Sequence, residues 1–336
     1  MKPRSFGVDP FSSLDAWTFE PVFREKTQIE EVDIFLCGMQ AHHPKWGGVV
    51  GSSANHGAYP ENSAWYELVE RIAILKAIQE KQLFLRDPQS EKIIGTIDGT
   101  KAFPSTFSDE AQYAKSNGVA LFNAWPEACR RATLELVERH LILASWIGYH
   151  KPERITQVPQ TELSRLERIY RVEHYNLGTQ RVSSLAAPVA VTAVVLWPKD
   201  PKHPLIYAFG GGETRAESIV KAETETWQRL GFLWGEELPQ SEPEFAPNQL
   251  YHQELYLFTK QHGRIESWLS GAFFNPKLPA LAPLLSMKFI DLSSDQTLHF
   301  KVAKAIAEEA IPLVFGKWRG GVFAGIDADR LIHPIA

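Results

Sequence analysis

The sequence predicts an α+β fold built from repeated β-hairpin/helix units with mixed or antiparallel sheets. Three copies of one helical pattern, Glu-x-x-Glu/Gln-Arg, begin at Glu67, Glu135 and Glu225. Apolar, β-branched segments separated by turn residues alternate with these copies. The 336 residues are 44% hydrophobic, which is enough to bury a large core. Together these observations predict a folded globular protein with internal repeats.

The first half of the chain contains two of the predicted helices. Apolar residues recur at helical spacing over residues 62–79, so a helix is expected there. Residues 83–98 read as two short strands joined by a Pro-Gln-Ser turn. Pro126 and Glu127 are typical of a helix start, and this second helix extends to about residue 147.

The second half begins with the polar segment 162–171, which suits either a short helix or a linker. Residues 188–197 and 205–209 predict a hairpin, and residues 210–212, all glycine, favour a strand-to-helix turn. The third motif helix follows these glycines. A further helix is expected over residues 298–310 and a final strand over 311–315. We divide the chain into an N-terminal segment, 1–47, and one catalytic domain with internal repeats, 48–336.

Composition excludes several classes of protein. The formal net charge is −5 and the pI is near 6.1, without runs of Lys or Arg, so a broad nucleic-acid surface is not expected. No apolar run reaches membrane length, and the N-terminus lacks the apolar core of a signal peptide. We therefore expect a cytoplasmic protein with no membrane partner. Cys37 and Cys129 lack paired-ligand spacing and are expected to be reduced, partly buried thiols.

The repeated pattern carries the chemical prediction. Residues three apart share a helix face, so each copy places two carboxylates, or a carboxylate and an amide, side by side. Like charges this close repel unless a cation lies between them, and carboxylate oxygens are ligands that Mg²⁺ prefers. One copy alone would usually be a solvated face with local ion pairs. Three copies in order favour a Mg²⁺–nucleotide site instead.

Several neighbouring residues allow two interpretations. Glu217 with Thr214 fits a capping box, and a metal role for Glu217 is the lesser alternative. Core packing is the first expectation for the tryptophans beside the motifs, and stacking on adenine is the alternative. These tryptophans are Trp46, Trp65 and Trp125.

Longer stretches around the three motifs resemble the YcaO family. Residues 63–71 look like that family's first nucleotide-binding helix. Residues 116–120, followed by Asn123, Glu127 and residues 135–139, are similar to its central signature. Residues 188–212 and 218–228 resemble its third block. The similarity is clear from residue 48 to residue 228.

This resemblance implies an ATP- and Mg²⁺-dependent enzyme of YcaO-like fold, with the motif helices around a nucleotide site. The nucleotide ligands that it implies are Ser63, Asn123, Glu135, Arg139 and, where the family often has arginine, Lys221. The Mg²⁺ ligands that it implies are Glu67, Glu70, Glu127 and Glu138. It assigns no catalytic residue in this chain. The third copy carries Gln228 and is expected to support the site.

YcaO proteins use ATP to activate a backbone amide of a ribosomally made precursor peptide. The resemblance therefore implies cyclodehydration of Cys, Ser or Thr to an azoline, with thioamide or amidine formation as the enzymatic alternative. A non-catalytic nucleotide-binding scaffold is the alternative from another class. We expect a separate leader-binding partner protein, and a homodimer is one option. Two departures are Gly51-Ser52-Ser53-Ala54 where the family often has Gly-Lys-Gly, and a C-terminus in which His333-Pro334-Ile335-Ala336 keeps only a trace of a proline-rich tail. Lys45 and Lys101 are the alternatives for the missing lysine, and no sequence pattern selects either.

Overall fold

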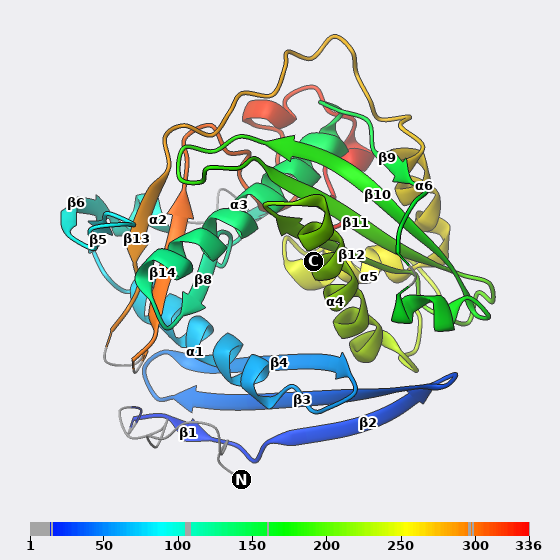
Figure 1. Cartoon of the computed structure of the whole chain (residues 1–336), viewed down its shortest axis with the longest axis horizontal. Helices are drawn as coiled ribbons and strands as arrows, with labels where there is room; N and C mark the ends of the chain where they lie inside the picture. Colours follow the sequence, from blue (N-terminus) through cyan, green and yellow to red (C-terminus); the bar gives the residue numbers. More distant parts are fainter. Residues whose placement is uncertain are drawn as a thin grey trace. The chain divides into compact units, whose positions relative to one another are not determined.

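The computed structural model describes residues 14, 16–104, 109–159, 161–294, 297 and 299–335. The chain forms two compact units, and α3 (Trp125–Ile147) begins in the first and continues into the second (Figure 1). Unit 1 contains residues 1–104, 115–135 and 287–306, and unit 2 contains residues 105–114, 136–286 and 307–336.

Unit 1 has two antiparallel sheets. In the first, β3 pairs on one side with β1 and β2 and on the other with β4. The second has the order β6-β5-β13-β14-β8. The helices and strands of this unit are β1 (Thr18–Phe19), β2 (Phe23–Ile29), β3 (Val32–His43), β4 (Gly47–His56), α1 (Glu61–Ile78), β5 (Gln82–Arg86), β6 (Ile93–Asp98), α2 (Gly99–Ala102), β8 (Val119–Phe122), β13 (Lys288–Asp291) and β14 (Lys301–Ile306).

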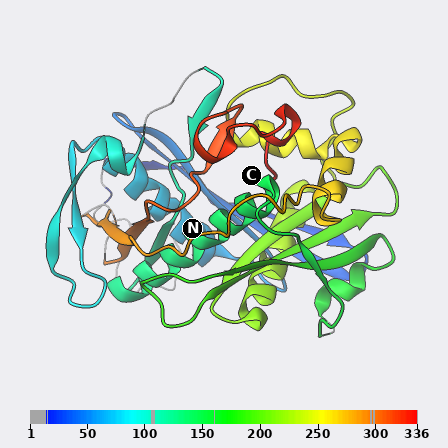
Figure 2. The ribbon, with the colours of Figure 1, turned by 90° about the horizontal axis from the view of Figure 1, so that it is seen from above.

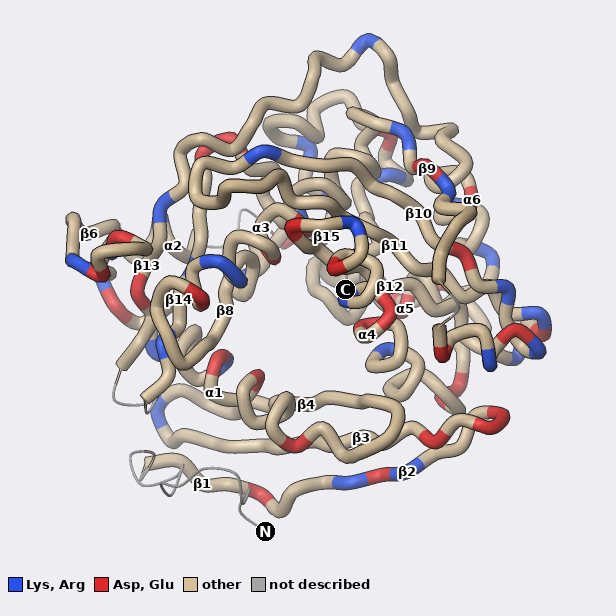
Figure 3. The backbone as a smooth tube through the Cα atoms, in the orientation of Figure 1, with Lys and Arg blue, Asp and Glu red and all other residues tan. Residues whose placement is uncertain are grey.

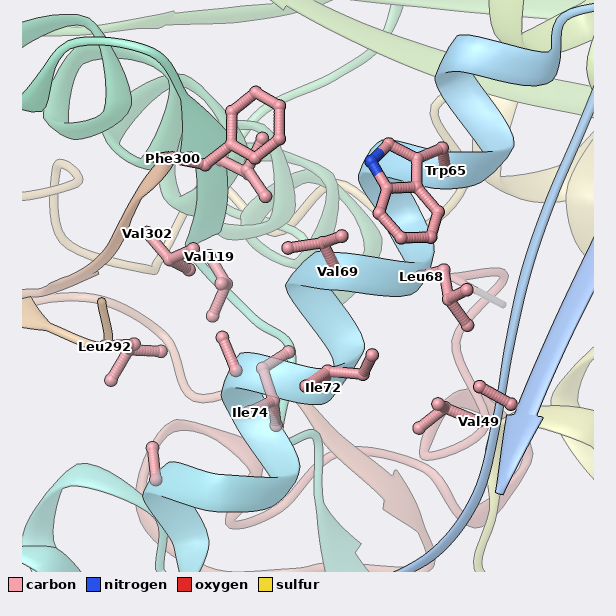
Figure 4. Close-up of a cluster of buried hydrophobic side chains, with 14 of the residues drawn as sticks. Val49, Trp65, Leu68, Val69, Ile72, Ile74, Val119, Leu292, Phe300 and Val302 are labelled. Atoms are coloured by element: carbon pink, nitrogen blue, oxygen red, sulfur yellow. The ribbon is translucent and has the colours of Figure 1, made fainter. Parts of the chain in front are cut away.

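The core of unit 1 lies around α1, which crosses the β3–β4 sheet (Figure 1). Most of the apolar residues that predict this helix are buried: Trp65, Leu68 and Ile72 have no exposed surface, whereas Leu75 and Ile78 near its end are partly buried. Side chains from the other sheet, including Val119 and Val302, complete the same cluster (Figure 4). Burial of large apolar side chains contributes roughly 1.5–3 kcal/mol each, so this stripe fixes the rotation of α1 about its axis.

Unit 2 is centred on the antiparallel sheet β12-β11-β10-β9. Figure 2 shows β10 and β11 side by side for most of their length, with α4 packed against β11 and β12. The helices and strands of this unit are β7 (Ala111–Tyr113), β9 (Glu153–Ile155), η1 (Glu162–Leu166), β10 (Tyr170–Gln180), β11 (Val189–Pro198), β12 (Ile206–Gly212), α4 (Arg215–Leu233), α5 (Gln249–Leu257), η2 (Thr259–Gln261), α6 (His262–Leu269), β15 (Val314–Gly316), η4 (Gly321–Phe323) and η5 (Ala328–Arg330).

The predicted motif helices and hairpins are confirmed as α1, α3, α4, β5–β6 and β11–β12. The polar segment 162–171 forms the short helix η1 and then enters β10. The boundary predicted between residues 47 and 48 falls inside β4, after its first residue, where the strand is already paired with β3.

The predicted helix over residues 298–310 is wrong. Its first residue, Leu298, lies outside the described residues, and Lys301–Ile306 form strand β14. This strand lies between β13 and β8, and Val302, Ala303 and Ala305 are fully buried. The requirement for a central strand overrides the helix propensity of an Ala- and Lys-rich segment. The final strand is also shorter than predicted, because β15 begins only at Val314.

The glycines at 210–212 are not a turn, because β12 continues through Gly212. A Cβ added at Gly210 would lie 2.3 Å from the Ala222 backbone nitrogen, and one at Gly212 would lie 2.7 Å from that of Ser218. Glycine is therefore required for α4 to lie against the strand. The helix begins after Thr214, whose side chain accepts from the Glu217 N–H, as the capping box predicts.

The described part of the chain contains no helix long and apolar enough to cross a membrane. Acidic and basic positions are interspersed along the backbone tube (Figure 3). Cys37 and Cys129 are free thiols, as predicted, but both are buried rather than partly buried.

Two buried histidines hold the last described residues of unit 2. His252 accepts from the Gly316 N–H through Nε2 at 2.9 Å and donates from Nδ1 to the His333 carbonyl at 2.9 Å. His333 donates through Nε2 to the Val314 carbonyl at 2.9 Å. Burial lowers the pKa of His252 well below its usual value, and burial lowers the pKa of His333 to about 4. Both rings are therefore neutral at pH 7.

We expect unit 2 to lose stability in mild acid. A histidine whose folded pKa is depressed stabilises above its unfolded pKa of about 6.5, and this stabilisation is lost as pH falls toward the folded value. From pH 6.5 to 5 the loss is about 2 kcal/mol per histidine. Denaturant unfolding at pH 7 and pH 5 should show a smaller difference for His333→Gln than for the unmodified chain. An equal pH dependence in both proteins would contradict this account.

Candidate functional site

The first motif lies on α1, and a glycine brings this helix onto strand β4. A Cβ added at Gly51 would lie 2.2 Å from the Ala64 carbonyl oxygen, so only glycine permits the approach. Glu67 accepts from the Ser52 N–H at 2.7 Å and pairs with Arg71 at 2.6 Å. Arg71 also donates to the Val50 carbonyl at 2.8 Å. The Glu67–Arg71 pair thus binds the β4 backbone.

Glu70 is the centre of a carboxylate cluster in unit 1, which we define as Glu67, Glu70 and Glu135. Burial raises the pKa of Glu70 well above its usual value, and the neighbouring charges of Glu135 and Glu67 raise it further. The Leu121 N–H donates to its carboxylate. Burial also raises the pKa of Glu67, although Arg71 opposes this shift. Packing therefore holds Glu67 and Glu70 where ionisation of their carboxyl groups is unfavourable.

Glu138 is the main acidic group of unit 2, and its surroundings differ. The carboxylate is buried and accepts from the Gly211 N–H at 2.8 Å and from the Lys221 amine at 2.9 Å. Arg139 lies 3.9 Å from its second oxygen. Burial alone would raise the pKa of Glu138, but Lys221 and Arg139 outweigh burial and lower it. Glu138 is therefore held as a carboxylate.

The remaining predicted ligands lie at the starts of helices. Ser63 is in the first turn of α1 and Asn123 is in the turn before α3, and both are exposed. Glu127, in the first turn of α3, pairs with Arg130 at 3.2 Å and with Arg131 at 3.0 Å. Its carboxylate is thus engaged by its own helix.

The third motif copy packs against the sheet of unit 2. Thr226 and Trp227 are buried, and the Arg229 guanidinium lies over the Tyr207 ring, 4.2 Å from its centroid. The Glu217 carboxylate accepts from the Glu213 N–H at 3.0 Å, one residue before the N-cap Thr214 whose N–H a regular capping box would use. Trp65 and Trp125 are core residues.

Two lysines absent from the predicted ligands lie in unit 1. Lys304 on β14 is only 5% exposed, and Glu135 and Glu70 both act on its charge. Lys115 donates to the Pro104 carbonyl at 2.6 Å. Only Lys115 could have been found from the sequence, because it directly precedes the Ser116-Asn117-Gly118 signature. The composition of the segment around Lys304 favours a helix, so no sequence pattern indicates a buried lysine on a strand there.

The donor chemistry of the cluster fits Mg²⁺. In the part of the chain that the structure describes, no three His, Cys, Asp or Glu side chains converge on one metal position. Mg²⁺ does not require such a cage, because it usually keeps several waters and binds one or two carboxylates together with substrate phosphates. Closely placed carboxylates with raised pKa values are the arrangement that a dication would stabilise.

Comparison with known proteins identifies the family. The family profile described as YcaO cyclodehydratase, ATP- and Mg²⁺-binding, matches residues 102–285, more than half of the chain. This chain belongs to the YcaO family. It is accordingly an ATP- and Mg²⁺-dependent enzyme of YcaO-type peptide modification. A search of curated proteins gave no match.

Solved YcaO structures share the fold. A YcaO from Methanopyrus kandleri, bound with AMPPCP and Mg²⁺, is 16% identical, with a TM-score of 0.55 over 86% of this chain and 85% of that one. The E. coli microcin synthetase McbBCD complex contains a chain that is 11% identical, with a TM-score of 0.55 over 85% of this chain and 87% of that one. A heterocyclase in complex with substrate and cofactor is 14% identical, with a TM-score of 0.52 over 90% of this chain but only 52% of its own. These likenesses confirm the predicted α+β fold with antiparallel sheets.

The different surroundings of Glu70 and Glu138 predict opposite effects on stability. A carboxyl with a raised folded pKa stabilises below its unfolded pKa, and this stability is lost as pH rises through the folded value. At pH 7 without Mg²⁺, Glu70→Gln should therefore raise Tm, by about 2–4 °C for each kcal/mol gained. Glu138→Gln should lower Tm, because it removes a charge that Lys221 and Arg139 stabilise.

Differential scanning calorimetry in EDTA measures both changes. Glu254→Gln, on α5, controls for loss of one negative charge. A lower Tm for Glu70→Gln would show that its carboxylate is already compensated and would contradict the cluster.

Proposed function

We propose that this enzyme uses ATP to activate backbone amides of a ribosomally made precursor peptide and forms thiazoline or oxazoline rings from Cys, Ser or Thr. Membership of the YcaO family carries this proposal. Each unit supports it separately: unit 1 holds the carboxylate cluster of Glu67, Glu70 and Glu135, and unit 2 holds Glu138 beside Lys221 and Arg139.

The proposal gives the motif residues two kinds of role. Glu67, Glu70 and Glu138 would hold Mg²⁺ through carboxylate oxygens, and Glu127 would join them by exchanging its partners Arg130 and Arg131. Ser63, Asn123, Glu135, Arg139 and Lys221 would bind the nucleotide. The guanidinium of Arg139 suits phosphate oxygens because it donates in a fixed fork, whereas Lys221 acts as a point charge.

Bound ATP would supply the phosphoryl group that turns an amide oxygen into a leaving group. The peptide's own thiol or hydroxyl would lose its proton and add to the carbonyl carbon, and the carbonyl oxygen would accept the γ-phosphoryl group as ADP leaves. That oxygen would then depart as phosphate while the amide nitrogen loses its proton and the C=N bond forms. The peptide thus loses two protons and one oxygen, the equivalent of one water, for each ring. The protein's contribution is to place the amide beside the nucleotide and to stabilise the phosphate charges.

We also propose that a separate protein presents the peptide. The similar E. coli chain belongs to the McbBCD complex. The leader would bind this partner as an added strand at a sheet edge, because an extended peptide gains affinity there through main-chain hydrogen bonds. Such a partner would leave the motif helices free to act on the peptide core.

Mass spectrometry of candidate precursor peptides tests the reaction. The enzyme, with its partner, ATP and Mg²⁺, should remove one water for each modified Cys, Ser or Thr. Exchange of oxygen for sulfur would instead identify a thioamide former, and gain of an amine with loss of water would identify an amidine former. Absence of any ATP-dependent mass change across the encoded peptides would support a scaffold and contradict the proposal.

Substitution of the motif carboxylates tests the assignment of the site. The double variant Glu70→Gln/Glu138→Gln should lose ATP turnover, because both proposed metal-binding carboxylates are neutralised. Phosphate release in the presence of peptide measures this. Glu225→Gln makes the same change in the third copy and should retain most of the activity. Unchanged Mg²⁺-ATP binding and turnover in the double variant would refute the assignment.

A further inference from the structure

The third motif helix carries an arginine whose charge is not compensated within the described residues. Arg229 lies near the end of α4, and its guanidinium carbon is 4.2 Å from the centroid of the Tyr207 ring on β12. Its Nε and Nη2 atoms are buried, and no atom of the described residues accepts a hydrogen bond from either. No ion pair in the described part of the chain includes Arg229. An aromatic face attracts a guanidinium but leaves its N–H groups without acceptors.

Tyr207 adds a third donor at the same place. Its side chain is 1% exposed, and its hydroxyl has no hydrogen-bond partner among the described residues. Burial raises the pKa of Tyr207, although Arg229 opposes this shift, so the phenol keeps its proton at pH 7. The adjacent Tyr256, whose ring lies edge-on with its centroid 6.2 Å away, donates instead to the Ile332 carbonyl. The Tyr207 hydroxyl is therefore available to a further acceptor.

The chemistry of these donors defines what would satisfy them. Buried polar groups almost always have a hydrogen-bond partner, and a donor left without one lowers stability. All three groups are donors and one of them belongs to a permanent cation, so the matching group is a negatively charged acceptor. Nε and Nη2 lie on one edge of the guanidinium, which can donate to two oxygens of a carboxylate or a phosphate.

The position of Arg229 on α4 separates it from the Glu138–Lys221 contact. Lys221, which donates to Glu138 at 2.9 Å, precedes Arg229 by two helical turns. Two turns correspond to about 12 Å along the helix axis. Arg229 as a whole is only partly buried, so a solute can reach its guanidinium.

We propose that Arg229 and Tyr207 form a binding site in unit 2 for an oxyanion, either a carboxylate or a phosphate group. The two guanidinium nitrogens donate to two oxygens of the ligand, and the Tyr207 hydroxyl donates to one of them. The Tyr207 ring holds the guanidinium in place through the cation–π contact. This inference does not depend on the proposed function, because the site requires neither metal nor nucleotide.

Replacement of Arg229 by methionine tests the site by differential scanning calorimetry on the full chain. Arg229→Met keeps an apolar side chain over the Tyr207 ring but removes the charge and its donors. In dilute chloride the variant should melt about 2–4 °C above the unmodified chain, because two buried donors without acceptors are gone. Excess acetate or inorganic phosphate, compared with chloride at equal ionic strength, should raise the Tm of the unmodified chain by about 5 °C. The same anions should shift the variant much less.

Arg171→Met is the matched control. Arg171, on β10 of the same sheet, also lies over an aromatic ring, 5.6 Å from the centroid of Trp197, but it pairs with Glu173 at 3.5 Å. Its replacement should not raise Tm in chloride and should leave the anion-dependent shifts unchanged. A larger shift in phosphate than in acetate would identify a phosphate group as the ligand, and the reverse would identify a carboxylate.

Tyr207→Phe provides an independent test, because it removes only the hydroxyl. Titration of the anion should show about tenfold weaker binding in this variant. This variant decides the result if Arg229→Met does not fold, and the melting transition itself reports folding.

The anion-dependent shift in Tm determines the outcome. Its loss in Arg229→Met together with its retention in Arg171→Met would support the site. Equal shifts in Arg229→Met and the unmodified chain, whatever their size, would overturn the inference. Such a result would show that Arg229 only packs against Tyr207, and it would leave the proposed function unaffected.

Discussion

Electrostatic repulsion among carboxylates that packing holds together is the constraint on which the candidate site depends. The buried stripe of α1, from Trp65 to Ile72, fixes the rotation of the helix, and Gly51 fixes its distance from β4. Glu67 and Glu70 have no freedom to separate by moving the backbone. A folded protein keeps an arrangement that lowers its stability only if other interactions compensate for the lost free energy. Such arrangements are concentrated at functional sites.

The buried carboxylates of the two units have different surroundings. In unit 2, a backbone N–H and the Lys221 amine compensate Glu138 directly, and its pKa is lowered. In unit 1, Glu70 has one backbone donor and two acidic neighbours, and its pKa is raised. Glu138 is therefore ionised in the folded protein. In the unit 1 cluster, neighbouring carboxylates repel one another, and a bound cation would reduce this repulsion. Glu135 and Glu138, one turn apart on α3, belong to these two contrasting environments.

Sequence predicted the elements whose signals are local. The period of Trp65, Leu68 and Ile72 identifies α1, and the Thr214–Glu217 pair identifies the start of α4. The motif spacing also led to the family. The sequence-based predictions are wrong where packing between distant parts of the chain determines the local structure. Within the segment 298–310, residues 301–306 form strand β14 because they are buried between β13 and β8. The glycines at 210–212 allow α4 to pack closely against β12, and no local sequence pattern indicates this contact. Lys304 was missed for the same reason, since its amine donates to the carbonyls of Lys115 and Asn117, which lie 189 and 187 residues earlier in the chain.

The central claim is that the unit 1 cluster binds the nucleotide's metal, and anomalous diffraction tests this most directly. Crystals grown with Mn²⁺ and a non-hydrolysable ATP analogue should show an anomalous peak within coordination distance of a Glu70 carboxylate oxygen. The same crystals of Glu70→Gln should lose that peak. Clear nucleotide density with every Mn²⁺ peak remote from Glu67, Glu70 and Glu135 would contradict the account.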